Sequence, residues 1–445
     1  MIAERIGAFL IAILLLAVPG TFGQTEKVLT LKECLELARK TNPALAVAAG
    51  AEREAGSGVA GARTNFLPKV INQSTYTRLD IVPFIAFGDS DFQFPGMEGM
   101  DRIEIGDDDN YNVVFSATQP IFSGGRIRNG YKAALLQYEA RGQNRDQAWL
   151  QVKFQTESQY LNLIKTRGTA EVARQSVDQM KSHLKDLESM YQVGLMAEND
   201  VLKSRVQLSN TELLRIQADN GVRYAQAALA STIGQPLGTA IVPGETLSEE
   251  STIPWSMKEI IDATQQSNPQ IRAGELNVEA GRRMVSVEKG GLLPSLSVIG
   301  NYNFKRPNRR YQPEFYSSWD VNLAVRMNLF DWGETFNRIS QARARLQQSE
   351  AGLEQLRDQL ALQGTLAYYS LQEAKERIDV TGITREQAQE NFRVTQAKFR
   401  EGLVTNTELL DAQIALTQAQ IQRIEALVNY QIARGNVEML MGGAE

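Results

Sequence analysis

The sequence predicts a mainly α-helical protein built from two copies of one helix–strand–strand–helix–helix unit. The first observation is an internal repeat: Asn42-Pro43 returns 226 residues later as Asn268-Pro269, and Gly194-Leu195 returns 208 residues later as Gly402-Leu403. Offsets this constant over many positions indicate a duplicated unit of roughly 200 residues. The drop from 226 to 208 places an insertion that is 18 residues longer in the first copy, between residues 70 and 118.

The second observation is the distribution of proline. Residues 121–235 and 314–445 contain none, although the chain has 13. An interior proline destabilises a helix by about 3 kcal/mol, so two such runs indicate long uninterrupted helices. At 1.5 Å per residue, the segment from Arg126 to Tyr191 has room for about 100 Å of helix. That length exceeds what a compact domain uses.

The N-terminus is predicted to be a secretory signal peptide, residues 1–23. Arg5 supplies the positive charge, residues 6–17 an apolar run and Thr21-Phe22-Gly23 a small-residue cleavage site. The run is shorter than the ~20 residues that a membrane-spanning helix needs, which disfavours an uncleaved anchor. After it, no stretch approaches 18 apolar residues, the length that indicates a transmembrane helix.

Composition excludes several classes of function. A formal charge of −5 and a pI near 5.4 argue against a nucleic-acid partner. With one histidine (His183) and one cysteine (Cys34), the chain has little for nucleophilic or transition-metal catalysis. Composition alone does not exclude acid/base catalysis by carboxylates. We expect no enzyme activity, no metal and no cofactor.

The two copies and their elements are predicted as follows. The first repeat covers 24–238, a linker 239–254 and the second repeat 255–445. In the first repeat we expect strands at about 67–79 and 110–122 and long helices at 126–191 and 199–233. In the second repeat we expect strands at about 294–305 and 318–330 and long helices at 334–399 and 406–440.

The long helices carry a narrow apolar stripe. In the second copy its members are Leu410, Ile414, Ile421, Ile424 and Val428, and in the first copy Leu202, Val206, Leu213 and Ile216. Such spacing is typical of a coiled-coil seam rather than of the broad face of a globular helix. Helices of this kind pack side by side along the stripe and expose their other faces to water, as in a solid bundle or in the wall of a tube.

The strands alternate between apolar and polar residues. Trp319, Val321, Leu323 and Val325 alternate with Asp320, Asn322 and Ala324. Strands of about ten residues with this pattern in an exported chain suit a transmembrane barrel with a watery interior. A half-buried soluble sheet gives the same alternation. Because bacterial barrels need at least eight strands and one chain supplies four, a membrane barrel would require several chains.

The turns between the long helices are the sharpest local signal. Gly194 and Gly402 can adopt the left-handed conformation that ends a helix. The following Asn199-Asp200 and Asn406-Thr407-Glu408 can cap the returning helix. Capping accounts for the polar residues but not for the leucine that follows each glycine, Leu195 and Leu403. If these leucines are exposed, they offer an apolar surface on which a partner could dock.

Two other motifs favour a structural interpretation. Gly56-Ser-Gly58-Val-Ala-Gly61 matches a dinucleotide fingerprint, but it lies late in a helical pattern instead of opening a helix after a strand. The acidic loop at about 83–110 could gather divalent cations, but it lacks the spacing of an EF-hand. A solvated surface loop explains it better.

Together these residues resemble the outer membrane efflux protein family, the TolC-like exit ducts of Gram-negative bacteria. The resemblance rests on the duplicated element order, the two Asn-Pro openings, the Leu67-Pro68 and Leu293-Pro294 strand starts, and the run from Phe399 through Gly402-Leu403 to Glu408-Leu-Leu-Asp411. It covers nearly the whole mature chain.

The resemblance implies a homotrimer in the outer membrane, with lipid around it. Its twelve strands would form one β-barrel continuous with a long periplasmic α-helical barrel. It also implies two further partners, a periplasmic membrane-fusion adaptor and an inner-membrane pump of the RND or ABC type. The function implied is the exit duct of a tripartite efflux or type I secretion system. A wide water-filled duct discriminates little between substrates, so the resemblance does not distinguish drug, metal, lipid and protein cargo.

The family's functional positions fall on the turns of this chain. Gly194, Leu195, Gly402 and Leu403 match the adaptor-docking edge. Glu408 and Asp411 match the acidic ring that narrows the periplasmic mouth, and Asp200 lies near it. Lys203 occupies the first-copy position that corresponds to Asp411, so the constriction would differ between the copies.

Two other functions compete with this interpretation. An exported coiled-coil scaffold with a soluble sheet would be recovered from the soluble periplasm. An exported hydrolase would need an acid and a base in one cleft, and neither copy offers such a pair outside the helical tips.

Overall fold

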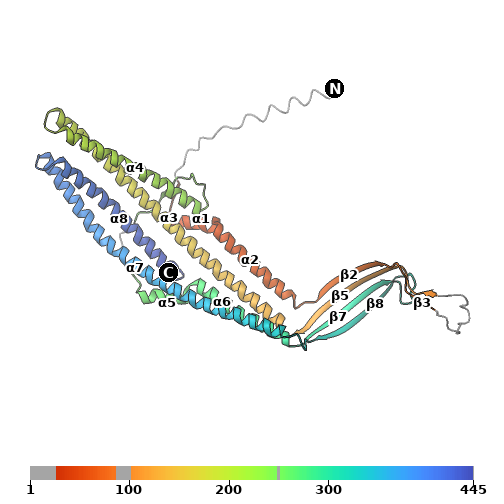
Figure 1. The fold of residues 1–445 in the computed structure, drawn as a ribbon. Coiled ribbons are helices and arrows are strands. Elements are labelled where there is room, and N and C mark those ends of the chain that lie inside the picture. Colours follow the sequence, from red (N-terminus) through yellow and green to blue (C-terminus); the bar gives the residue numbers. More distant parts are fainter. Residues whose placement is uncertain (1–26, 87–101, 248–250, 444–445) are drawn as a thin grey trace, which may run out of the picture. The chain divides into compact units, whose positions relative to one another are not determined.

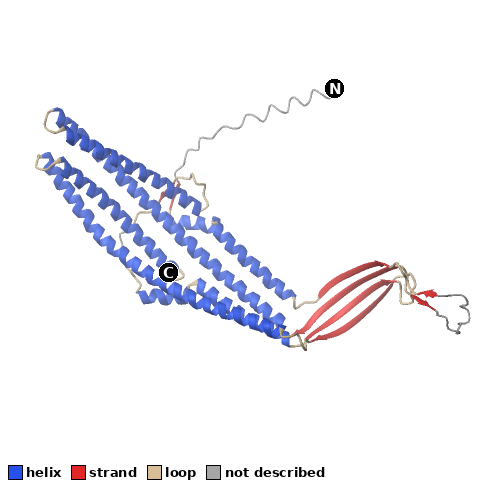
Figure 2. Cartoon of the chain, in the orientation of Figure 1, coloured by secondary structure: helices blue, strands red, loops and turns tan. Residues whose placement is uncertain are grey.

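The structure is a computed structural model, which describes residues 27–86, 102–247 and 251–443. The expected signal peptide, 1–23, lies outside the described residues. Within them, two series of helices and strands follow one another in the same order (Figures 1 and 2).

The first series begins with β1 (Lys27–Leu29), α1 (Leu31–Thr41) and α2 (Pro43–Thr64). It continues with β2 (Lys69–Arg78), β3 (Phe84–Ala86), β4 (Arg102–Glu104) and β5 (Asp109–Ser123). It ends with the long helices α3 (Arg126–Gln192) and α4 (Glu198–Thr232). The capping box at the start of α1 joins Thr30 to Glu33.

The second series begins with β6 (Ile241–Pro243), α5 (Met257–Ser267) and α6 (Pro269–Lys289), followed by a 3-10 turn, η1 (Gly290–Leu292). It continues with β7 (Ser295–Arg306), β8 (Tyr316–Arg326), α7 (Glu334–Arg400) and α8 (Asn406–Leu440). The helices α3 and α7 have 67 residues each, and α4 and α8 have 35 each. The repeat is thus preserved residue for residue in helix length.

The last strand is shorter than the expected 318–330. β8 pairs with β7 only as far as Arg326, opposite Ser295, because β7 begins there. The following residues instead prepare α7, since Asp331 accepts hydrogen bonds from the backbone N–H groups of Gly333 and Thr335 at its start. The segment 239–254, expected as a linker, contains β6, which pairs in parallel with β1.

Four strands form one antiparallel sheet in the order β2-β5-β7-β8. β5 and β7 lie in the middle, so one series supplies β2 and β5 and the other supplies β7 and β8 (Figure 2). The outer strands, β2 and β8, each have one edge without a partner within the described part of the chain.

The chain divides into two compact units that cut across the repeat. Of the described residues, unit 1 comprises those within 1–46, 148–264 and 361–445, and unit 2 comprises those within 47–147 and 265–360. The sheet belongs to unit 2. There α6 packs along α7, with Arg357 bonded to Glu275 at 2.7 Å, and α2 packs along α3, with Arg145 bonded to Glu52 at 2.9 Å.

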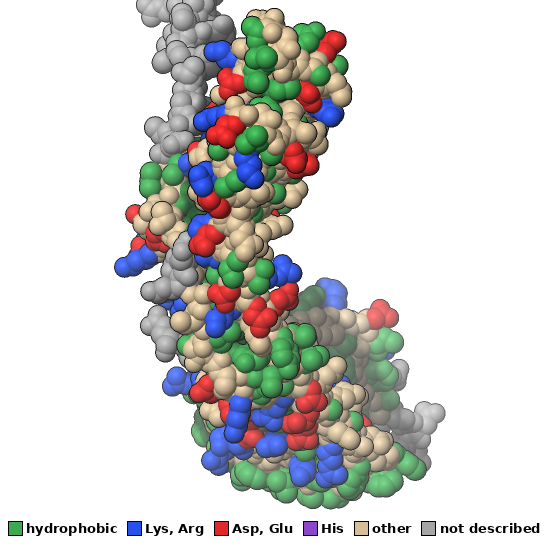
Figure 3. Space-filling view, turned by 90° about the vertical axis from the view of Figure 1, so that its left-hand side faces the viewer, with side chains coloured by type: hydrophobic (Ala, Val, Ile, Leu, Met, Phe, Trp, Pro, Cys, Tyr) green, Lys and Arg blue, Asp and Glu red, His purple; other side chains and the backbone are tan. Residues whose placement is uncertain are grey.

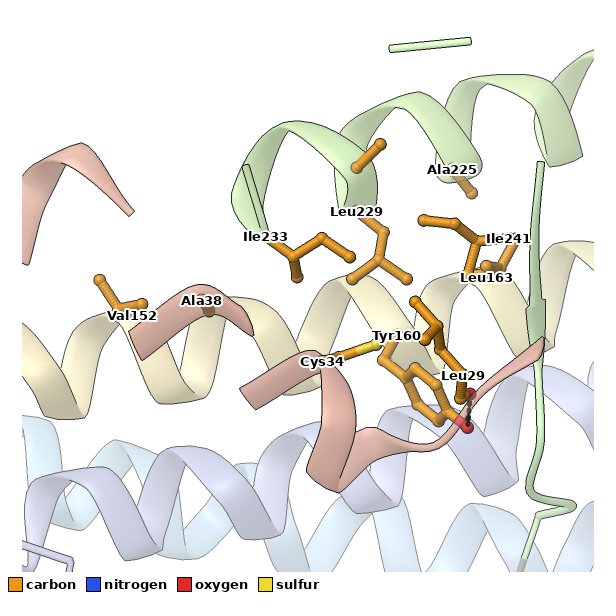
Figure 4. Close-up of a cluster of buried hydrophobic side chains, with 11 residues drawn as sticks. Leu29, Cys34, Ala38, Val152, Tyr160, Leu163, Ala225, Leu229, Ile233 and Ile241 are labelled. Atoms are coloured by element: carbon orange, nitrogen blue, oxygen red, sulfur yellow. Dashed lines mark hydrogen bonds between the residues drawn. The ribbon is translucent and has the colours of Figure 1, made fainter. Parts of the chain in front are cut away.

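Unit 1 has a hydrophobic core where β1, α1, α3 and α4 meet (Figure 4). Cys34, Leu163 and Leu229 are fully buried there, and the Tyr160 hydroxyl donates a hydrogen bond to the Leu29 carbonyl at 3.2 Å. Burial raises the pKa of the Cys34 thiol to about 11. As expected from the sequence, Cys34 packs as a small apolar residue.

Among the described helices, none combines the length and the apolar character that crossing a membrane requires. Charged side chains are frequent along them, and Figure 3 shows Lys, Arg, Asp and Glu mixed with hydrophobic side chains on one face.

Candidate functional site at the helical tips

The two turns between the long helices have the same backbone geometry. Gly194 and Gly402 have positive φ angles of 77° and 73°. In each turn the glycine N–H bonds back to the carbonyl three residues earlier, and the following leucine N–H to the carbonyl five residues earlier, at 2.9–3.0 Å. This is the Schellman ending of a helix, which glycine permits because it has no Cβ.

The leucines of these turns are not used for packing within the chain. Leu195 and Leu403 expose 72% and 68% of their surface. A Schellman motif usually buries the residue after its glycine against the preceding helix, so an exposed leucine there is unusual. Val193, beside the first turn, is 69% exposed. The tips therefore present apolar side chains to solvent.

Glu408 takes part in the cap of α8, as its position after the turn predicted, but its partner is Thr405. The helix cap of α8 is Thr405, not Asn406 or Thr407, and Glu408 closes a capping box with it. The Glu408 carboxylate accepts the Thr405 N–H at 2.7 Å and the Thr405 hydroxyl at 2.9 Å. These bonds lower the pKa of Glu408. Glu408 is therefore held ionised and in a fixed orientation.

The other acidic positions differ from Glu408. Asp411 is exposed one turn further along α8. Asp200 is half-buried in the first turn of α4, whose N-cap residue Ala197 makes no side-chain hydrogen bond. The expected cap by Asn199 and Asp200 is thus absent from α4. Lys203 donates a hydrogen bond to the Thr407 hydroxyl at 3.4 Å, which brings the first turns of α4 and α8 together.

A buried polar cluster behind the turns joins the two helical hairpins, one formed by α3 and α4 and the other by α7 and α8. The Asn406 side chain, only 3% exposed, donates to the Asp200 carbonyl at 3.1 Å and to the Ser204 hydroxyl at 3.0 Å. Its oxygen lies 2.8 Å from His183 Nε2. Because both Asn406 N–H groups are used, its oxygen is the acceptor and His183 Nε2 is the donor. One side chain of α8 thereby connects α3 and α4.

Two further polar pairs continue this contact between α3 and α8. The hydroxyls of Ser176 and Thr417 lie 3.0 Å apart, and Gln413 donates to Gln179 at 2.7 Å. From the sequence, Asn406 is expected at the cap and His183 has no predicted role. A polar residue every three or four positions of an otherwise apolar stripe was the available signal, but it does not identify the partner helix.

The apolar stripes of the two repeats have different surroundings. In α8, Leu410 and Val428 are buried. In α4 the corresponding stripe is open, with exposed fractions between 46% and 63%: Leu202, Val206, Leu213 and Ile216. A second open stripe follows one face of α7 in the same unit, with exposed fractions between 55% and 63%: Leu362, Leu366, Tyr369, Val380 and Ile383.

The sheet of unit 2 also has one open apolar face. Trp319, Val321, Leu323 and Val325 expose 64–76% of their surface. On the opposite face the Asp320 carboxylate accepts hydrogen bonds from Asn301 and Asn322 at 2.7 and 2.6 Å. The hydrogen-bonded polar face contrasts with an apolar face that no described part of this chain covers.

Among the described residues, no three His, Cys, Asp or Glu side chains are placed so that they could hold a metal ion together. In the acidic loop expected to be a solvated surface, residues 87–101 lie outside the described residues. At its described end, Asp107 pairs with Arg306 at 3.1 Å and Asp108 with Arg78 at 2.9 Å. Arginine thus neutralises two of these carboxylates.

The sequence model of the outer membrane efflux protein family matches residues 34–235 and 260–443, one match for each repeat. The chain belongs to the outer membrane efflux protein family. Membership places it in the cell outer membrane, as the sequence predicted.

Individual relatives are distant. The chain is 22% identical over 187 residues to the outer membrane protein TolC of Vibrio cholerae, a match that spans 41% of this chain and 43% of TolC. It is 22% identical to the proteases secretion protein PrtF of Dickeya chrysanthemi, over 96% of this chain and 92% of PrtF. The crystal structure of the CmeC outer membrane channel of Campylobacter jejuni has the same fold, with a TM-score of 0.80 at 16% identity, covering 93% of this chain and 85% of CmeC.

Proposed function

We propose that this chain is the outer-membrane exit duct of a tripartite efflux or type I secretion system. Substrates would pass from a periplasmic adaptor and an inner-membrane pump to the cell exterior. The duct has no enzyme activity of its own in this proposal. It would be a homotrimer whose tunnel is gated at the helical tips.

The observation that carries the proposal is the sheet. It has an uncovered apolar face, a hydrogen-bonded polar face and, within the described residues, two unpaired edges, on β2 and β8. In water the apolar face would be unfavourable, and in lipid an open edge would leave backbone groups unsatisfied. Both problems are solved if β8 of one copy pairs with β2 of the next inside a membrane. The alternation of strand directions makes that pairing antiparallel.

Closure of the ring is also supported in unit 1. The open stripes lie on different helices, α4 and α7, so a copy can meet its neighbour through two different surfaces. Such heterologous contacts form rings when the rotation closes. Three copies would give twelve strands, above the minimum of eight for a bacterial barrel. The number three follows from the family resemblance.

The tips are the proposed docking edge for the adaptor. Gly194 and Gly402 fix the turn, and the exposed Leu195 and Leu403 supply apolar contact. In a trimer there would be six such leucines around the mouth. Exposed apolar residues that are repeated by symmetry suit a partner with its own repeated apolar surface.

Glu408, Asp411 and Asp200 are proposed to form the periplasmic gate. Three copies each of Glu408 and Asp411 would place six carboxylates around the opening. At a separation near 8 Å in water, each pair of like charges is repelled by about 0.5 kcal/mol. The mouth would therefore attract cations and open readily when a partner rearranges the helices. Glu408→Gln with Asp411→Asn should weaken cation selectivity in bilayer recordings, and unchanged selectivity would contradict the gate.

The decisive experiment is the protein mass per particle after detergent extraction of the outer-membrane fraction. A mass of three chains supports the shared barrel. A monomer in the soluble periplasm would refute the duct and favour an exported coiled-coil scaffold. The uncovered Trp319–Val325 face already disfavours that scaffold, because a soluble sheet would bury it.

A further inference from the structure

A cavity of about 360 Å³ lies in unit 1 behind the tip turns, where α3, α7 and α8 meet. Its walls combine apolar and polar side chains from all three helices. The residues that carry the argument are Met180, His183 and Asp186 of α3, Phe399 and Arg400 of α7, and Gln413 of α8.

The walls of this cavity are firmly held. Met180 and Phe399 are 2% and 8% exposed, and His183 packs edge-on against the Phe399 ring with 5.4 Å between ring centroids. Gln413 is fixed by its hydrogen bond to Gln179, and His183 by its bond to Asn406. Because these groups are already partnered, the walls are not free to collapse into the space.

The mouth of the cavity carries two charges of opposite sign. Asp186 and Arg400 are exposed, and within the described part of the chain neither has an ion-pair partner. A cavity with aromatic and thioether walls and a few polar groups is typical of small-molecule sites. Methionine sulfur and phenylalanine both make favourable contacts with aromatic rings.

The volume limits the size of the occupant. A cavity of about 150 Å³ binds benzene, so 360 Å³ has room for roughly 14 non-hydrogen atoms at the same density. That corresponds to two fused rings with a polar substituent. Larger polycyclic molecules would not fit.

We propose that this cavity binds a small aromatic molecule with a polar substituent, and that the bound molecule holds the two helical hairpins together. The site spans the hairpins, since α3 belongs to one and α7 and α8 to the other. Both the binding and the contact between the hairpins stand on the cavity, so neither depends on the proposed duct.

The test uses 1-aminonaphthalene as the probe and the full-length protein in detergent, with amide hydrogen exchange as the readout. We expect the probe to slow exchange in 179–190, 392–400 and 409–413. Gln396→Trp, which places an indole in the cavity from its α7 wall, should abolish this protection. The matched control is Gln389→Trp, an exposed glutamine two turns earlier on α7 and outside the cavity, which should retain it.

If the probe protects none of these segments, or if protection persists in Gln396→Trp, the site is refuted. Ser182→Trp, at the exposed mouth, repeats the test should Gln396→Trp lose its helical circular dichroism. Exchange in the first turns of α4, which does not line the cavity, then tests the hairpin-holding role: the probe should slow it in the wild type and in Gln389→Trp, but not in Gln396→Trp. Protection of the cavity segments without any effect on α4 would refute the hairpin-holding role. Protection in a protein that forms no channel would count against the duct alone.

Discussion

Replacing Asn406 with leucine should loosen the helical tips without unfolding the protein. Leucine keeps the branching of asparagine but has two methyl groups in place of the amide, so it removes three hydrogen bonds, one to each of His183, Asp200 and Ser204. The replacement leaves each of the three partners without its hydrogen bond to Asn406, and an unsatisfied buried polar group destabilises the folded state. At about 1 kcal/mol for each bond, the contact between the hairpins loses about 3 kcal/mol.

That loss corresponds to a roughly 100-fold increase in local opening, which amide hydrogen exchange can measure. Exchange should accelerate in the first turns of α4 and α8 and around His183, and the core near Cys34 should be unchanged. The control is Asn199→Leu, which replaces an exposed asparagine in the first turn of α4 and should have no effect on exchange. If exchange at the tips of Asn406→Leu matches that of Asn199→Leu, the cluster does not hold the hairpins.

Three other predictions concern assembly, the buried thiol and the helix cap. Leu213→Glu should leave the helical content of the chain intact, because Leu213 is 58% exposed, but it should shift the detergent-extracted particle to monomers; an unchanged mass would exclude α4 from the contact between copies. Cys34, with no exposed surface and a pKa of about 11, should resist iodoacetamide at pH 8 and react only upon unfolding. The pKa of Glu408 is lowered in the folded protein, so its stabilisation of α8 is present above its unfolded value of 4.5 and is lost as the pH falls through the folded pKa. Exchange in the first turn of α8 should therefore rise below pH 4.5, and Thr405→Ala should raise it at neutral pH and flatten this pH dependence.

The sequence predicts the long helices because their signal is local. The helix expected at 126–191 runs from Arg126 to Gln192, and that expected at 406–440 runs from Asn406 to Leu440. Proline-free length and a glycine stop depend on one segment at a time. The end of β8 was placed too late for the same reason: alternation continues to Leu329, whereas the ladder ends where β7 begins.

The cluster around Asn406 could not be predicted in this way. It joins residues 223 positions apart, and a helix pattern reports only which face is apolar. Asn406 at a helix start has an ordinary explanation as a cap, and here Thr405 has that role instead. The same holds for the open stripe of α4: its spacing matches that of α8, so sequence alone cannot tell which of the two is covered within the chain.

The two repeats also differ at the tips, where the residues of the polar cluster have no equivalent in the other repeat. Offset by 208, the positions of Asn406, His183 and Ser204 are occupied by Glu198, Asn391 and Ala412. In the proposed ring each copy's second repeat meets the first repeat of its neighbour, so these residues would form the corresponding contact between chains. Glu198 is exposed, and Ala412 has no hydroxyl to accept a bond.

The contact between chains would therefore lack the hydrogen-bonded cluster found within each chain. We expect the tips to open first between copies, with each chain's two hairpins moving as one body. A disulfide introduced between Glu198→Cys and Asn391→Cys of neighbouring copies should then lower bilayer conductance, and a reductant should restore it. A disulfide within one chain, between Ser204→Cys and Asn406→Cys, should leave conductance near its wild-type value. The opposite order of effects would show that opening separates the hairpins of a single chain.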